Sequence, residues 1–338
     1  MFASAFFLAA LAPSLALAQD SQTGITLKLE GGVAGIQGAD VGIFSLVRDL
    51  PATNTSQLNF EEGMARGPLS FGYRAEAKYS FDLGNGTLMR IGGIFSGQEG
   101  STHEDAALYG FVVVRPGGPD PALPEAEIVI CPFPNSCGRF AGDLDRSYHE
   151  VMPELMVGRA GEGGRMSWIG LQGFSGQFQE QTSNTIQYLP PFGPFAMTTT
   201  TDLAADAKGF VLAFQHERPM ASGATVFPGG GLGTYTMDAS GVSMDIAVPS
   251  SAKPVGGSFD GTRAQLAVGI EYPVRELLTI GATLRADSWS AQPRINMGWN
   301  DGACSPSLCE PPSRNGNFNL VTDPLMSLSV GVSLTLWI

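Results

Sequence analysis

Few residues in this sequence are of the types that carry acid–base chemistry. The histidines are His103, His149 and His216, and each is followed by a glutamate. The HExxH pattern, which places two histidines and a catalytic glutamate around zinc, is absent from the sequence. Asp145 precedes His149 by four residues, and the pair could meet as a general acid and base at the rim of a fold. Polar rim residues are more often simply solvated, so we predict no catalytic residue and no enzyme.

A second candidate for chemistry is a cation site. Asp143 and Asp145, in the segment GDLDR, could hold a calcium ion between hard carboxylate oxygens. No glycine-centred EF-hand loop surrounds them, so the end of a solvated loop is the simpler interpretation. We therefore predict neither a metal site nor a bound cofactor.

The four cysteines form two close pairs, Cys131 with Cys137 and Cys304 with Cys309. Each pair lies in a segment rich in Pro, Asn, Ser and Gly. This arrangement predicts two local disulfides that staple loops in an oxidising compartment. A four-cysteine zinc site is the alternative, but both spacings are wider than those of structural zinc ligands.

The N-terminus has the features of an export signal. Residues 2–12 are almost wholly apolar, and Ala16-Leu17-Ala18 forms a small-x-small cleavage box. We predict cleavage before Gln19, so that residues 1–18 are a signal peptide and 19–338 the mature domain. No lysine or arginine precedes the apolar run, so either the α-amino group supplies the only positive charge or the true start lies upstream. A buried N-terminal helix is the alternative to a signal peptide. No later segment approaches the roughly 18 continuous apolar residues of a transmembrane helix, so a membrane-embedded mature chain would have to be a closed barrel.

The composition narrows the class of partner. The formal charge of −13 argues against nucleic acid, because binding phosphates requires a basic surface. Charged residues make up only 15% of the chain, well below the average of soluble domains, and there are 44 glycines. These values fit a sheet with many turns and an apolar outer face.

One stretch shows the strand pattern clearly. In LSFGYRAEAKYSFDLGNG, residues 69–86, large apolar residues occupy the odd positions and charged or small residues the even ones. Such strict alternation is typical of a β-strand. Aromatic residues lie at both ends of the apolar face. From Phe71 to Phe81 a strand rises about 33 Å, which a tilt of about 40° reduces to the height of an outer-membrane apolar band. We interpret the odd face as meeting lipid and the even face as lining a lumen.

Ten strand-like segments recur, at about residues 23–35, 69–82, 87–97, 147–159, 165–179, 206–217, 224–238, 263–272, 278–287 and 326–338. The Asn85-Gly86 dipeptide predicts a type I′ hairpin turn. Residues 106–115 could extend a strand or form an additional one.

Short turns at 83–86, 160–164, 218–223 and 273–277 alternate with long connections, of which 98–146 and 288–323 are the largest. This asymmetry predicts an all-β, up-and-down antiparallel transmembrane barrel of about ten strands. Its short turns and both termini would be periplasmic, and its long loops extracellular. Barrels of eight or twelve strands, and a secreted soluble β-sandwich, are the alternatives.

The C-terminal strand carries a family resemblance. Ser329, Gly331, Leu334 and Leu336 have the spacing of the β-signal, so the chain resembles bacterial, porin-like outer-membrane β-barrel proteins. Many such barrels end in an aromatic residue, whereas here Ile338 is last. The resemblance implies an outer-membrane location, contact with membrane lipid, and recognition by the barrel-assembly machinery. The Asp/His pair resembles the chemistry of omptin-like proteases, but the accompanying motifs are missing.

Charges of both signs fall on the predicted inner face: Arg74, Glu76, Lys78, Arg90, Arg263, Glu271, Arg285 and Asp287. Small polar residues on the last strands would leave room for water beside them. The first hypothesis is therefore a narrow, porin-like passive channel for small solutes or ions. The second is a closed structural barrel whose stapled extracellular loops bind a surface ligand, as in an adhesin. Nothing in the sequence marks an oligomer interface.

Overall fold

The computed structural model describes residues 23–37, 69–108, 110–115, 125–130, 138–188, 196–245, 248–298 and 317–338. The predicted signal peptide 1–18 and the proposed disulfide residues Cys131, Cys137, Cys304 and Cys309 lie outside these ranges.

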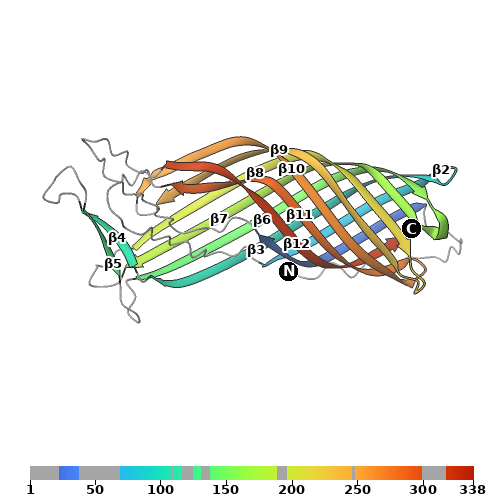
Figure 1. Cartoon of the computed structure of the whole chain (residues 1–338), viewed down its shortest axis with the longest axis horizontal. Helices are drawn as coiled ribbons and strands as arrows, with labels where there is room; N and C mark the ends of the chain where they lie inside the picture. Colours follow the sequence, from blue (N-terminus) through green and yellow to red (C-terminus); the bar gives the residue numbers. More distant parts are fainter. Residues whose placement is uncertain are drawn as a thin grey trace.

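Ten long strands close into one antiparallel barrel (Figure 1). They are β1 (Gly24–Gln37), β2 (Leu69–Gly84), β3 (Thr87–Leu108), β6 (Gly138–Ala160), β7 (Met166–Tyr188), β8 (Ala196–Pro219), β9 (Thr225–Asp245), β10 (Val248–Arg275), β11 (Leu278–Gly298) and β12 (Asn317–Trp337). Each strand pairs with its neighbours in sequence, and β12 closes the ring against β1, from Thr26 opposite Trp337 to Gln37 opposite Met326. The predicted up-and-down barrel of ten strands is thus confirmed.

Two short strands lie outside the ring. β4 (Gly110–Arg115) pairs with β5 (Glu125–Ile130) as a separate two-stranded sheet beyond one end of the barrel (Figure 1). Of the two alternatives for residues 106–115, the additional strand is therefore correct for its second half, while β3 ends at Leu108. A single 3-10 turn, η1 (Glu162–Gly164), joins β6 to β7.

The alternation along β2 corresponds to the two faces of the barrel wall. Phe71 is 62% exposed on the outer face, whereas Glu76 is only 9% exposed on the inner face. The same outward exposure of large apolar residues recurs on the other strands, for example at Leu232 and Val332. A closed ring satisfies its backbone hydrogen bonds internally, so it can present this apolar surface to lipid. Within the described residues, no helix is long and apolar enough to cross a membrane.

The long-loop interpretation was wrong over much of its length. The segments 98–146, 180–205 and 288–323 contribute strand residues to β3, β6, β7, β8, β11 and β12. The reason is the solvent, because beyond the apolar band the outer face of a strand meets water and not lipid. Both faces can then be polar, and the alternation of apolar and polar residues disappears. The run MTTTT at 197–201, for instance, is paired strand in β8.

The two ends of the barrel differ. The turns that join β2 to β3, β6 to β7, β8 to β9 and β10 to β11 are short and lie at the same end as Ile338, opposite the β4–β5 hairpin (Figure 1). In outer-membrane barrels the end with short turns faces the periplasm. We therefore call this end periplasmic and the other end extracellular.

The β2–β3 turn supplies a test of the local backbone. Asn85 and Gly86 have φ values of 55° and 70°, as a type I′ turn requires. We expect Gly86→Ala to lower the free energy of unfolding by about 1 kcal/mol, because a Cβ atom disfavours the left-handed region. Gly93→Ala is the matched control, since nothing lies within 4 Å of its added Cβ and its φ is not positive. Equal losses in the two variants, measured by urea titration in lipid vesicles, would contradict this account.

Candidate functional site

A cavity of about 930 Å³ occupies the barrel lumen. It begins among residues of the periplasmic end, such as Gly223 and Glu276, and reaches Gln98, Gln292 and Leu325 toward the extracellular end. The structure places all eight charged residues named from the sequence on its wall: Arg74, Glu76, Lys78, Arg90, Arg263, Glu271, Arg285 and Asp287.

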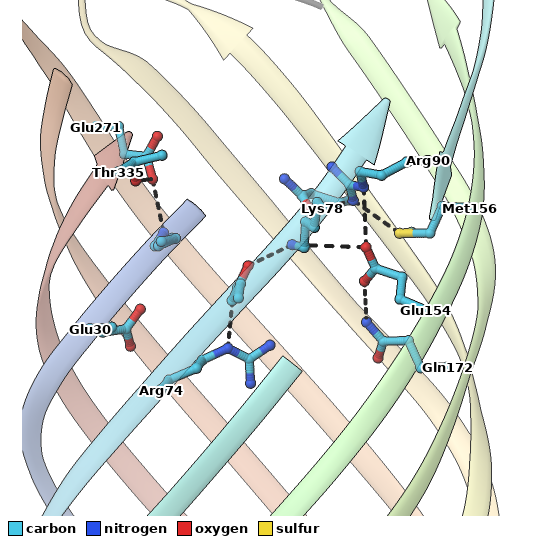
Figure 2. A network of polar contacts seen from close by, with 12 residues as sticks. Glu30, Arg74, Lys78, Arg90, Glu154, Met156, Gln172, Glu271 and Thr335 are labelled. Atoms are coloured by element: carbon cyan, nitrogen blue, oxygen red, sulfur yellow. Dashed lines mark hydrogen bonds and ion pairs between the residues drawn. The ribbon is translucent and has the colours of Figure 1, made fainter. Parts of the chain in front are cut away.

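A continuous series of ion pairs runs along the cavity wall, and Figure 2 shows its part from Arg74 through Lys78 and Glu154 to Arg90. This charge ladder consists of Glu30, Arg285, Glu76, Arg74, Lys78, Glu154, Arg90 and Glu217. Glu76 is its centre, with Arg74 at 2.5 Å and Lys78 at 2.6 Å. Because the carboxylate is buried, each of these pairs compensates a desolvated charge rather than a solvated one.

Residues of the charge ladder also make contacts between strands that are not neighbours in the ring. Arg285 on β11 donates to Glu30 on β1 at 2.9 Å, which spans β12. Arg90 on β3 reaches Gln215 on β8 at 3.0 Å and stacks over the ring of Trp168, 4.4 Å from its centroid. Such side-chain contacts between non-adjacent strands stabilise the barrel and reduce the open space inside it.

Nearer the extracellular end, Arg263 forms the most buried contact in the lumen. Its side chain is 1% exposed and bonds to Glu150 at 2.6 Å and to Asp287 at 2.5 Å. Ser96 and Tyr148 also donate to the Glu150 carboxylate, at 2.9 and 2.8 Å. Arg263 on β10 lies four strands from β6, which carries Glu150, so this ion pair crosses nearly the whole lumen.

Aromatic side chains beside the Arg263–Glu150 ion pair also make contacts across the lumen. Trp289 on β11 contacts Tyr148 on β6, with ring centroids 5.6 Å apart, and Phe174 on β7 at the same separation. β11 and β6 stand five strands apart in a ring of ten, so they face each other. The Arg263 guanidinium lies against both the Phe174 and the Trp289 rings, 4.8 and 4.2 Å from their centroids. We call Tyr148, Glu150, Phe174, Arg263 and Trp289 the cross-lumen belt.

A hydrophobic cluster fills the lumen on one side of the belt. It includes Phe178, Leu203, Val211 and Met237, which project inward from β7, β8 and β9. These side chains are all 5% exposed or less. These side chains pack together as a core on this side of the lumen, and Phe178 and Met237 also border the cavity.

The opposite side of the belt is built from small residues. Gly32 on β1, Gly72 on β2, and Ser327 and Ser329 on β12 line the cavity there, and we call them the small-residue wall. The cavity continues past Trp289 to Gln292, three residues further toward the extracellular end of β11. The cavity lining therefore extends to both sides of Trp289 and includes residues of both the belt and the small-residue wall.

Two hydroxyl groups indicate that the cavity suits water. The side-chain oxygens of Thr279 and Thr283, both on the cavity wall, have no hydrogen-bond partner among the described residues. Thr283 is only 3% exposed. Buried hydroxyls almost always bond to protein or to ordered water, so a hydrated cavity would satisfy them.

The acid–base candidates do not gather in the lumen, since none of the three histidines lines the cavity. Asp145 and His149 both lie on β6, where four residues of extended strand separate them by about 13 Å, so their expected meeting does not occur. His149 instead contacts Tyr73 at 2.9 Å. His103 bonds to Asp143 across β3 and β6 at 2.6 Å, on the exposed outer face.

Other sequence candidates are placed as follows. Among the described residues there is no group of three or more side chains that could hold a metal ion. Of the β-signal residues, Ser329 and Gly331 line the cavity, while Leu334 and Leu336 are exposed outward at 47% and 39%. Their role in assembly remains a prediction.

Two of the five belt residues, Tyr148 and Glu150, were hidden in the sequence by the mixed pattern of their strand. Tyr148 and Glu150 share β6 with Met152 and Met156, which also face inward, so charged, aromatic and apolar side chains mix on one face. Lys28 and Glu30 were detectable, because β1 alternates cleanly and places both on its polar face. Lys28 binds Glu271 at 2.9 Å in the structure (Figure 2).

No family model and no curated protein matches the chain. Among solved structures it is similar to the outer membrane protease OmpT from Escherichia coli, with 8% identity, 96% of this chain and 99% of that chain covered, and a TM-score of 0.43. It is also similar to a FadL homologue from Pseudomonas aeruginosa, with 10% identity, 93% and 90% covered, and a TM-score of 0.29. At these identities the similarity concerns the fold alone.

The closed ring and its apolar outer band define the class to which the chain belongs. It is an integral β-barrel protein of the bacterial outer membrane.

Proposed function

We propose that this protein is a narrow, passive outer-membrane channel for small solutes or ions. The observation that carries the proposal is the cavity itself, whose lining extends from the periplasmic end past Trp289 to Gln292 and includes the small-residue wall. We infer that the passage runs along this wall, beside the cross-lumen belt and off the barrel axis. A ten-stranded barrel lies between the smallest barrels, whose interiors are filled, and the large open porins. A partly filled lumen with one polar passage matches that size.

The charge of the cavity wall sets the expected selectivity. Eight acidic and six basic side chains line it, so the wall carries a small excess of negative charge. Glu217 and Glu276 lie near its periplasmic opening. In a narrow space between low-dielectric walls, such an excess favours cations over anions. We therefore propose a modest cation preference.

Conductance of the refolded protein in a planar bilayer tests the proposal. We expect small, discrete and reproducible current steps, with a reversal potential in a salt gradient that indicates cation preference. The double variant Glu217→Gln/Glu276→Gln should shift that reversal potential toward zero, because the excess acidic charge is removed. Glu162→Gln is the matched control, since Glu162 is exposed at the same end but does not line the cavity.

The negative outcome is equally specific. No current steps from protein whose insertion is confirmed by circular dichroism and heat-modifiable migration would overturn the channel proposal. Current without a difference between the double variant and Glu162→Gln would overturn the selectivity while leaving the conduction.

A second function is favoured by a separate observation. β6, β7, β8 and β9 continue well beyond the apolar band, and the packed cluster inside them makes this extracellular extension rigid. A closed barrel that presents such an extension to a surface ligand, as an adhesin does, would need no conduction. Silent but correctly inserted protein would make this the leading function.

A further inference from the structure

Four outward-facing polar residues interrupt the apolar outer face at the periplasmic end of β6, β7 and β8. Arg159, Ser167 and His216 are direct cross-strand neighbours, with Arg159 opposite Ser167 and Ser167 opposite His216. Arg218 follows two residues after His216 on the same face of β8. The Ser167 hydroxyl and the His216 Nδ1 atom are 2.9 Å apart. We call these four residues the basic row.

The basic row lies at the edge of the lipid-facing surface. On the same strands the next outward residues are Val157, Ile169 and Phe214, which are 42%, 59% and 53% exposed. The row therefore begins where this apolar surface ends. Side chains at that depth meet lipid headgroups rather than acyl chains or bulk water.

The opposite end of the same strands is acidic on balance. Its outward-facing charged residues are Asp143 and Asp145 on β6 and Asp202 and Asp206 on β8, against the basic Arg139 on β6 and Lys208 on β8. The chain as a whole is strongly acidic, with a formal charge of −13. A cluster of two arginines, a histidine and a serine at one interface is thus a local departure from the composition.

We propose that the basic row binds the phosphodiester headgroup of an anionic phospholipid in the periplasmic leaflet. The Arg159 and Arg218 guanidinium groups would donate hydrogen bonds to the phosphate oxygens, in the bidentate geometry that the planar guanidinium favours. Ser167 and His216 lie between them and add a hydroxyl and an imidazole N–H. The acyl chains would lie along the apolar surface formed by Val157, Ile169 and Phe214.

Native mass spectrometry of the refolded full chain in neutral detergent micelles tests the proposal. Phosphatidylglycerol is titrated against the wild type and against Arg159→Gln/Arg218→Gln. We expect one or a few retained lipids in the wild type and a roughly tenfold weaker half-saturation in the variant, because two charge-assisted hydrogen bonds are lost. Arg275→Gln is the matched control, since Arg275 is also exposed at the periplasmic end but belongs to β10.

The outcomes separate the sources of the effect. Equal weakening in Arg275→Gln would mean that total charge governs retention, which overturns the site. Phosphatidylcholine retained as strongly as phosphatidylglycerol, or inorganic phosphate competing fully, would also overturn an anionic-lipid site. Heat-modifiable migration checks that each variant folds, and Arg159→Lys/Arg218→Lys should restore part of the binding if charge at these positions is what matters.

Discussion

Replacing Arg263 with methionine is expected to lower the free energy of unfolding by about 3–5 kcal/mol. The substitution keeps an unbranched apolar stem but removes the guanidinium, which leaves the Glu150 and Asp287 carboxylates without their shared cation. The side chains of Arg263 and Glu150 are 1% and 5% exposed, so the carboxylate charge that remains is poorly solvated. Removing one member of a buried ion pair has this cost because an uncompensated buried charge results. Urea titration of the barrel in lipid vesicles measures it.

An exposed ion pair provides the control. Arg139 bonds to Asp105 at 2.5 Å, but its side chain is 64% exposed. Arg139→Met should therefore cost at most about 1 kcal/mol, because water replaces the lost partner. Comparable losses in the two variants would mean that the cross-lumen belt is not desolvated, and the description of a packed crossing would be wrong.

Trp289→Ala is expected to change both stability and conduction. Trp289 is 5% exposed and contacts Tyr148, Phe174 and Tyr235, so its removal leaves a cavity and should cost about 3–5 kcal/mol. The same cavity would adjoin the passage along the small-residue wall. We expect single-channel conductance to rise severalfold, because the lumen beside the belt becomes wider.

The graded variant Trp289→Phe separates the two effects. It keeps a ring in the belt and should lose less stability and widen the passage less. A destabilised Trp289→Ala barrel with unchanged conductance would show that ions do not pass beside the belt. In that case the passage would have to be sought elsewhere in the lumen, and the off-axis proposal would fail.

The period-two pattern by itself determined the barrel. In the membrane-spanning part of a strand, one face contacts lipid and the other face lines the lumen. Successive residues therefore alternate between apolar and polar types, and this alternation is visible in the sequence. That is why Phe71 and Glu76 could be assigned to opposite faces. The Asn85-Gly86 turn could also be predicted from the sequence, because few residue types adopt the positive φ values that it needs.

The same reasoning explains where the sequence misled. The extracellular parts of β7 and β8, including Thr182 and Thr201, have water outside and packed polar or apolar groups inside. Without lipid, the outer face has no need to be apolar. Alternation therefore weakened, and paired strands resembled loops.

Only the tertiary structure decided how the lumen is divided. Arg263 and Glu150 are separated by 113 residues in the chain, and their contact depends on the closure of β12 against β1 and on the stagger between all ten strands. The local alternation predicts which side chains face the lumen, but it does not predict which residue of a distant strand each of them contacts. The belt, the small-residue wall and the passage between them are products of that closure.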